Sequence, residues 1–95
     1  MEAKEEYDVW RHTQAEDFIS RNFSEEKLEK KLMAISTQLR KDPTTAKTLT
    51  FMKPEARRGE LMKYLRRELM RELDLPSFEE WKKANIQPGL FTNRL

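Results

Sequence analysis

Apolar residues recur every three or four positions in two stretches of this chain, and this spacing restricts the fold more than any other feature. One stretch carries Leu28, Leu32, Ile35 and Leu39, and the other carries Leu61, Leu65 and Leu69. Because an α-helix has 3.6 residues per turn, each pattern places its members on one face of a helix. The first stretch has fewer than two heptads, so it is predicted to be the face of a helix in an all-α bundle and not part of an extended coiled coil.

Residues that start or stop helices mark the ends of both stretches. Ser24 is a good N-cap for a helix over about 25–41, and Pro43 prevents that helix from continuing. The second helix is predicted over 55–73, and its pattern stops before Pro76. These two helices are expected to be long and central.

Two further helices are predicted at the ends of the chain. Residues 4–23 place Tyr7 and Trp10 on one side of a helix. Ser77 and Glu80 have the spacing of a capping box, which indicates a short helix near the C-terminus. The fold is therefore expected to be a small bundle of about four helices, with a short C-terminal helix and a tail.

The segment 43–52 supports two interpretations. Asp42 as a cap and Pro43 at the first helical position would open a short helix with Leu49 facing inward. Its threonines and Phe51 would also suit a strand. Because one strand alone has nothing to pair with, a short helix or turn is favoured.

Length and composition indicate a single domain over 1–95, and they favour a location inside the cell. A chain of 95 residues is long enough for one modest core. It has no cysteine, so disulfides and thiolate chemistry are excluded. The acidic start and the lack of a long apolar run argue against a signal peptide or a membrane span, and a cytoplasmic location is expected. Flexible ends are expected at 1–4 and 88–95.

Residue types used in catalysis are scarce. The chain has one histidine, His12, and two glycines, Gly59 and Gly89. Zinc sites and phosphate-binding loops therefore lack their usual residues, and no metal or cofactor is expected. Carboxylates are plentiful, but they stand in helical turns rich in Lys and Arg, so no matched acid and base emerges. The chain is predicted not to be an enzyme.

The helix over 55–73 and the residues just before it are basic. The segment 53–71 has seven bases and three acids, which gives a net charge of +4. The candidate residues for binding an anion or a nucleic acid are Lys53, Arg57, Arg58, Lys63, Arg67 and Arg71. Three interpretations stay open: a solvated face partly neutralised by Glu60 and Glu68, a contact surface for a protein, and a surface for phosphate.

Aromatic residues occur in every predicted element, as expected of residues that supply a core from all sides. They are Tyr7, Trp10, Phe18, Phe23, Phe51, Phe78, Trp81 and Phe91. Met33 and Met70, by contrast, lie off the apolar stripes of their helices, which indicates additional apolar surface. Met33, Met70 and Tyr64 are therefore the candidate residues for binding a partner.

These patterns favour a small non-catalytic protein-binding or regulatory module that acts through helix faces. Its partner is expected to be a protein, and self-association is a further expectation because it would bury the additional apolar surface. The alternative is a DNA- or RNA-binding regulator that uses the basic helix 55–73.

Overall fold

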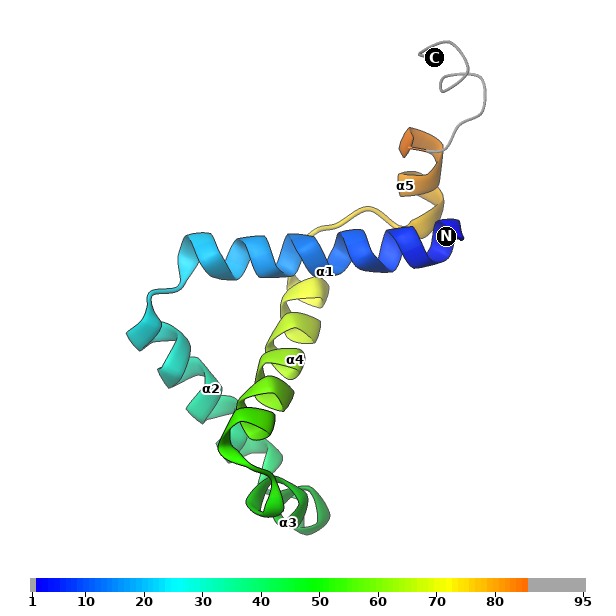
Figure 1. Cartoon of the computed structure of the whole chain (residues 1–95). Coiled ribbons are helices and arrows are strands. Elements are labelled where there is room, and N and C mark those ends of the chain that lie inside the picture. The colour runs from blue at the N-terminus through cyan, green and yellow to red at the C-terminus, as the bar shows by residue number, and fades with distance from the viewer. Residues whose placement is uncertain (1, 86–95) are drawn as a thin grey trace.

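The computed structural model describes residues 2–85, which form helices and no strands (Figure 1). The helices are α1 (Ala3–Asn22), α2 (Glu25–Leu39), α3 (Pro43–Phe51), α4 (Pro54–Glu72) and α5 (Phe78–Asn85). The prediction of an all-α fold is confirmed. Met1 and residues 86–95 lie outside the described part, so the expectations for the C-terminal tail are not tested there.

The described residues contain five helices instead of about four, and the additional one is α3. The Asp42 carboxylate accepts hydrogen bonds from the backbone N–H of Thr45 (3.0 Å) and from its hydroxyl (2.7 Å), which caps the helix at Pro43. The threonine hydroxyls of α3 turn back onto its own backbone, as where Thr48 donates to the carbonyl of Thr44 (3.0 Å). A cap and a proline at the first position thus outweigh the strand preference of threonine.

Two predicted helix starts are confirmed by their caps, whereas α2 ends at Leu39, two residues before the predicted end at 41. The Ser24 hydroxyl accepts a hydrogen bond from the backbone N–H of Lys27 at the start of α2 (3.1 Å). Ser77 and Glu80 form the reciprocal bonds of a capping box before α5: Glu80 N–H donates to the Ser77 hydroxyl (3.2 Å), and Ser77 N–H donates to the Glu80 carboxylate (3.0 Å). Each of these caps joins residues three positions apart, so the sequence alone was enough to predict them.

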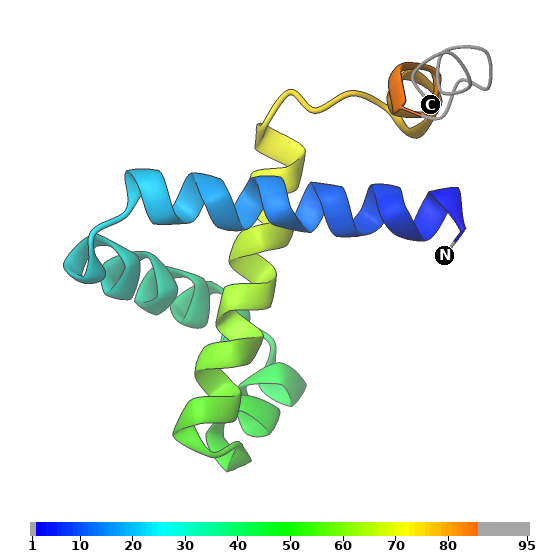
Figure 2. The same cartoon turned by 45° about the horizontal axis from the view of Figure 1, so that its top comes forward.

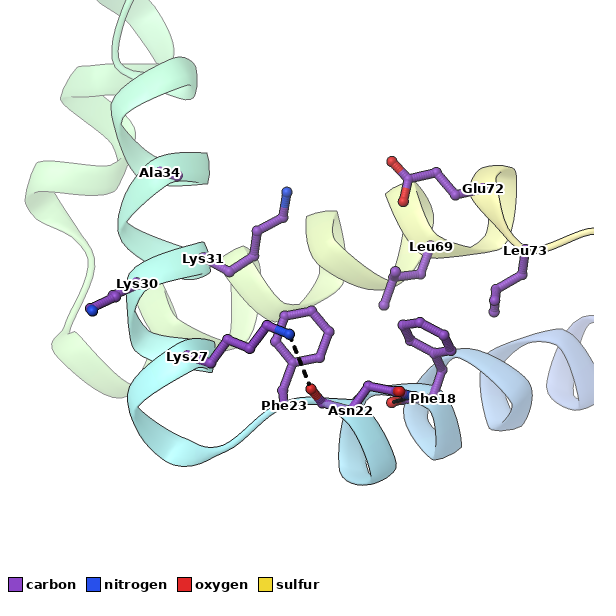
Figure 3. A pocket seen from close by; sticks show the side chains of 10 residues that line it. All are labelled: Phe18, Asn22, Phe23, Lys27, Lys30, Lys31, Ala34, Leu69, Glu72 and Leu73. Atoms are coloured by element: carbon purple, nitrogen blue, oxygen red, sulfur yellow. Dashed lines mark hydrogen bonds between the residues drawn. The ribbon is translucent and has the colours of Figure 1, made fainter.

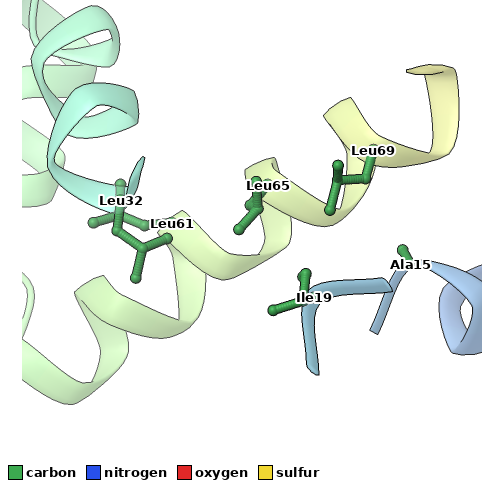
Figure 4. Packing of buried hydrophobic residues seen from close by; sticks show 6 residues of the cluster. All are labelled: Ala15, Ile19, Leu32, Leu61, Leu65 and Leu69. Carbon is green, nitrogen blue, oxygen red and sulfur yellow. The ribbon is translucent and has the colours of Figure 1, made fainter. Parts of the chain in front are cut away.

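The leucine stripe of α4 is the centre of the main core. Both α1 and α2 pack against α4, and α1 crosses it near its C-terminal end (Figures 1 and 2). Leu32 of α2 lies next to Leu61, while side chains of α1 approach the C-terminal half of the stripe (Figure 4). The buried cluster consists of Ala15, Ile19, Leu32, Leu61, Leu65 and Leu69.

Aromatic residues form a second cluster that attaches α5 to α1. The Tyr7 ring centroid lies 5.4 Å from that of Phe78 and 5.5 Å from that of Trp81. The Tyr7 hydroxyl also donates a hydrogen bond to the carbonyl of Pro76, at 2.8 Å. Among the predicted core aromatics within residues 2–85, Phe51 is the exception, because it is 78% exposed on α3; Phe91 lies outside the described residues. The expectation that Phe51 is buried is therefore wrong.

None of the helices within residues 2–85 has the length and apolar character needed to cross a membrane.

Candidate functional site

An open groove of about 820 Å³ lies between α1, α2 and α4 (Figure 3). It exists because the chain turns sharply after α1, so that α2 leaves the end of α1 at an angle and both helices meet α4 separately (Figure 1). We call it the binding groove. It is lined by Phe18, Asn22, Phe23, Lys27, Lys30, Lys31, Ala34, Leu69, Glu72 and Leu73.

The floor of the binding groove is apolar and only partly covered. Phe18 and Phe23 meet edge to face, with ring centroids 6.5 Å apart, and both are half-buried. Leu69 belongs to the core, whereas Leu73 is half-buried and Ala34 is exposed. The main core therefore continues into the groove, where no other part of residues 2–85 covers it.

Three lysines of α2 line the binding groove. Lys27 and Lys31 point toward the side where Glu72 of α4 lies, whereas the Lys30 ammonium points outward from α2 (Figure 3). Lys27 donates to the carbonyl of Asn22 (3.4 Å) and lies 5.3 Å from the Phe23 ring centroid. Lys30 pairs with Glu26 (3.5 Å), and Lys31 pairs with Glu68 of α4 (3.4 Å). The lining residues thus carry three positive charges and one negative charge.

Two of the six candidate anion-binding residues already have partners in the fold. The Arg57 guanidinium donates to the backbone carbonyls of Leu49 (2.8 Å), Met52 (2.9 Å) and Thr50 (3.5 Å), so it satisfies carbonyl groups at the end of α3. Arg58 forms an ion pair with Glu29 of α2. These contacts give both arginines a structural role that their place in the sequence did not reveal.

Three of the remaining bases form a row along the exposed side of α4, which we call the basic row: Lys63, Arg67 and Arg71. Among residues 2–85, none of the three pairs with a carboxylate. The expected neutralisation of Arg71 by Glu68 is absent, because Glu68 pairs with Lys31. The Arg67 guanidinium lies 5.7 Å from the Tyr64 ring centroid, and Lys53 is exposed before α4.

The three candidate partner-binding residues line no common groove. Met33 is 68% exposed and borders a shallow groove with Arg57 and Arg58. Tyr64 is half-buried between α4 and its neighbours α2 and α3. Met70 is half-buried and packs against the main core, so it is less exposed than Met33. None of the three lines the binding groove.

Sequence reasoning missed the binding groove because its residues come from three helices. Phe18 and Phe23 were predicted to belong to the core, and the lysines of α2 were not among the candidate residues. The only local signal is the spacing of Lys27, Lys30 and Lys31, which share one side of α2 beside the apolar stripe. The aromatic floor depends on the angle at which α2 leaves α1, which the sequence pattern does not give.

The titratable groups with shifted pKa values are helix caps. Hydrogen bonds from the Thr45 hydroxyl and N–H lower the pKa of Asp42, and those from the N–H and hydroxyl of Ser77 lower the pKa of Glu80. Both groups are exposed, and their partners are residues of their own turns. Within residues 2–85, no three His, Asp or Glu side chains gather as a metal site would require.

No protein-family model matches the chain, and no curated protein or solved structure is significantly similar to it.

Proposed function

We propose that this chain is a small non-catalytic protein-binding or regulatory module that holds its partner in the binding groove. The observation that carries the proposal is the apolar floor of Phe18, Phe23 and Leu73, which continues the core to the surface. Covering apolar surface contributes about 25 cal/mol per Å² removed from water, so such a floor favours an occupant. Partly exposed aromatic side chains in a recess are typical anchors of protein interfaces.

The form of the binding groove favours a protein over a small molecule. Small-molecule sites usually enclose roughly 70–90% of the ligand surface. The binding groove is open along one side, so a small apolar ligand would stay largely in water (Figure 3). A protein segment brings its own outer surface to cover that side.

A cytoplasmic location and self-association stay predictions. Light scattering on the purified chain, which gives its mass in solution, tests self-association.

Site-specific cross-linking in the cells that make this protein tests the proposal. A photoreactive benzoylphenylalanine replaces Ala34, which is exposed and lines the binding groove. The matched control carries it at Thr13, which is exposed on α1 outside the groove. Discrete cross-linked protein species are expected from position 34 and not from position 13. No species from position 34, or the same species from both positions, would contradict the proposal.

A nucleic acid is the second candidate ligand, and the basic row is the observation that favours it. Lys63, Arg67 and Arg71 follow one another at intervals of four on an exposed face. Like charges at this spacing destabilise a helix slightly, so a polyanion would relieve their repulsion. Arg57 and Arg58 are already engaged, which leaves a smaller set of bases than the sequence indicated.

Binding to fluorescent duplex DNA and single-stranded RNA at two salt concentrations tests this candidate. If the basic row meets three phosphates, affinity for duplex DNA falls about 40-fold when salt rises from about 50 to about 200 mM. Arg67→Glu would then abolish binding, while Lys47→Glu on α3 makes the same change of charge away from the row and would leave most of it. Weak binding that both variants reduce equally would exclude a specific role for the row.

A further inference from the structure

We infer that the occupant of the binding groove is an amphipathic α-helix of another protein, with acidic residues along the edge that faces α2. This inference rests on the proposed function and names its ligand class. Three features of the groove carry it: the lysines on one side, the absence of a sheet edge within residues 2–85, and the surface that a second copy would offer.

The lysines of α2 give the binding groove one positive side. Lys27 has no carboxylate within ion-pair distance among residues 2–85. The pair of Lys30 with Glu26 joins side chains that are 75% and 82% exposed, so it is weak and easily exchanged. Lys31 is paired with Glu68 of α4, and both side chains are half-buried. Lys27 and Lys30 are therefore available to carboxylates of an incoming segment.

The opposite side of the binding groove carries a different charge. Glu72 projects from α4 across from Lys27 and Lys31 (Figure 3). An occupant with acidic residues toward α2 and neutral or basic residues toward Glu72 would meet complementary charge on both sides. This asymmetry fixes the orientation of the occupant as well as its composition.

A helix suits this site better than an extended strand. Residues 2–85 contain no strand, so an extended peptide would find no sheet edge for its backbone N–H and C=O groups. A helix satisfies those groups internally and presents apolar side chains at intervals of three and four. Such a row would lie over Phe18, Phe23 and Leu73, with α1, α2 and α4 as neighbours.

A second copy of this chain does not offer such a helix within residues 2–85. The large apolar side chains that are exposed there are Val9, Met33 and Phe51. On its face of α1, Val9 has two acidic residues one turn before it and His12 and Thr13 one turn after it, so no apolar row runs beside it. Met33 lies near Arg57 and Arg58, so that surface would bring positive charge to the lysines. Phe51 ends α3, whose residues Pro43–Phe51 include no Asp or Glu, so it offers no acidic edge. None of these surfaces within residues 2–85 matches the binding groove, and the occupant is therefore inferred to be a segment of a different protein.

Designed peptides test the inference directly. The first probe is a fluorescent 14-residue helical peptide with leucines at the first, fourth, fifth and eighth positions and glutamates along one edge. The second probe has the same leucines and lysines in place of the glutamates. We expect saturable binding of the acidic probe and about tenfold weaker binding of the basic one, since two exposed charge pairs contribute on this scale.

Charge reversal on the protein supplies the decisive comparison. Lys27→Glu/Lys30→Glu should reverse the preference between the two probes, whereas Lys41→Glu/Lys47→Glu, with the same change of charge outside the groove, should leave the preference intact. The inference is overturned if neither probe binds below about 1 mM, or if both double variants respond alike. It is also overturned if oleate, and not the acidic peptide, binds in the groove.

The species cross-linked at position 34 gives a second readout with the natural partner. Mass spectrometry of the cross-linked peptide should identify a segment with apolar residues at helical spacing and Asp or Glu along one edge. A segment of this same chain, or a basic segment, would overturn the inference while leaving the protein-binding proposal intact. No cross-linked species at all would contradict both.

Discussion

Arg57→Met would remove the donors that connect α4 to the end of α3. In the folded chain the Arg57 guanidinium donates to the carbonyls of Leu49, Met52 and Thr50, at 2.8, 2.9 and 3.5 Å. Methionine keeps a similar apolar stem but has no N–H group that could donate a hydrogen bond. The substitution therefore isolates the hydrogen bonds from the packing of the stem.

The expected loss of stability follows from the geometry of these bonds. Hydrogen bonds to charged groups contribute about 1.5–3 kcal/mol each, and the two shorter bonds are partly buried, which places them at the low end. The third bond is long and exposed, so it is not counted. The Leu49 carbonyl still accepts a bond from the N–H of Met52 (3.3 Å), which lessens the loss. The net decrease in the free energy of unfolding is about 2 kcal/mol.

Urea unfolding followed by circular dichroism measures this decrease. For a slope of about 1–3 kcal/mol per M, the midpoint should fall by about 0.7–2 M. Arg58→Met is the matched control, because it breaks an exposed ion pair with Glu29 and should cost under about 1 kcal/mol. If Arg57→Met were no more destabilising than Arg58→Met, the structural role of Arg57 would be refuted, and Arg57 would again be a candidate for binding an anion.

Three further substitutions have defined outcomes. Gly59→Ala should raise the free energy of unfolding by about 0.5–1 kcal/mol, measured in urea, because Gly59 lies inside α4 with nothing within 4 Å of an added methyl group; a decrease would contradict the helical geometry there. Tyr7→Phe should lower it by about 1 kcal/mol and change tryptophan fluorescence, since the bond to the Pro76 carbonyl is lost; an unchanged stability would show that this bond contributes nothing. Asp42→Ala should destabilise the chain at pH 7 and much less in acid. The bonds from Thr45 lower the pKa of Asp42, so their contribution is complete above the unfolded-state pKa of about 4 and is lost as pH falls through the lowered folded-state pKa; equal destabilisation at pH 7 and about pH 2 would contradict this linkage.

The starts of α2 and α5 were predictable because their causes are local. Ser24, Ser77 and Glu80 cap helices through residues three positions away, and such pairs are visible in the sequence. The segment 43–52 was harder, since threonine favours strands and the cap by Asp42 favours a helix. The structure has a helix in this segment, as the cap by Asp42 favours. Partner residues were less predictable, as Met70 shows: it lies off the leucine stripe, and yet it packs against the core.

Spacing along the chain was enough to predict the four helices other than α3 and the leucines of α4 that face the core, because both depend on residues of one helix. What the charged and the aromatic residues do depended on the tertiary structure. The angle between α1 and α2 places Phe18, Phe23 and Lys27 around one groove, and the approach of α3 to α4 engages Arg57. Such contacts join residues of different helices, and helical periodicity carries no information about how helices cross.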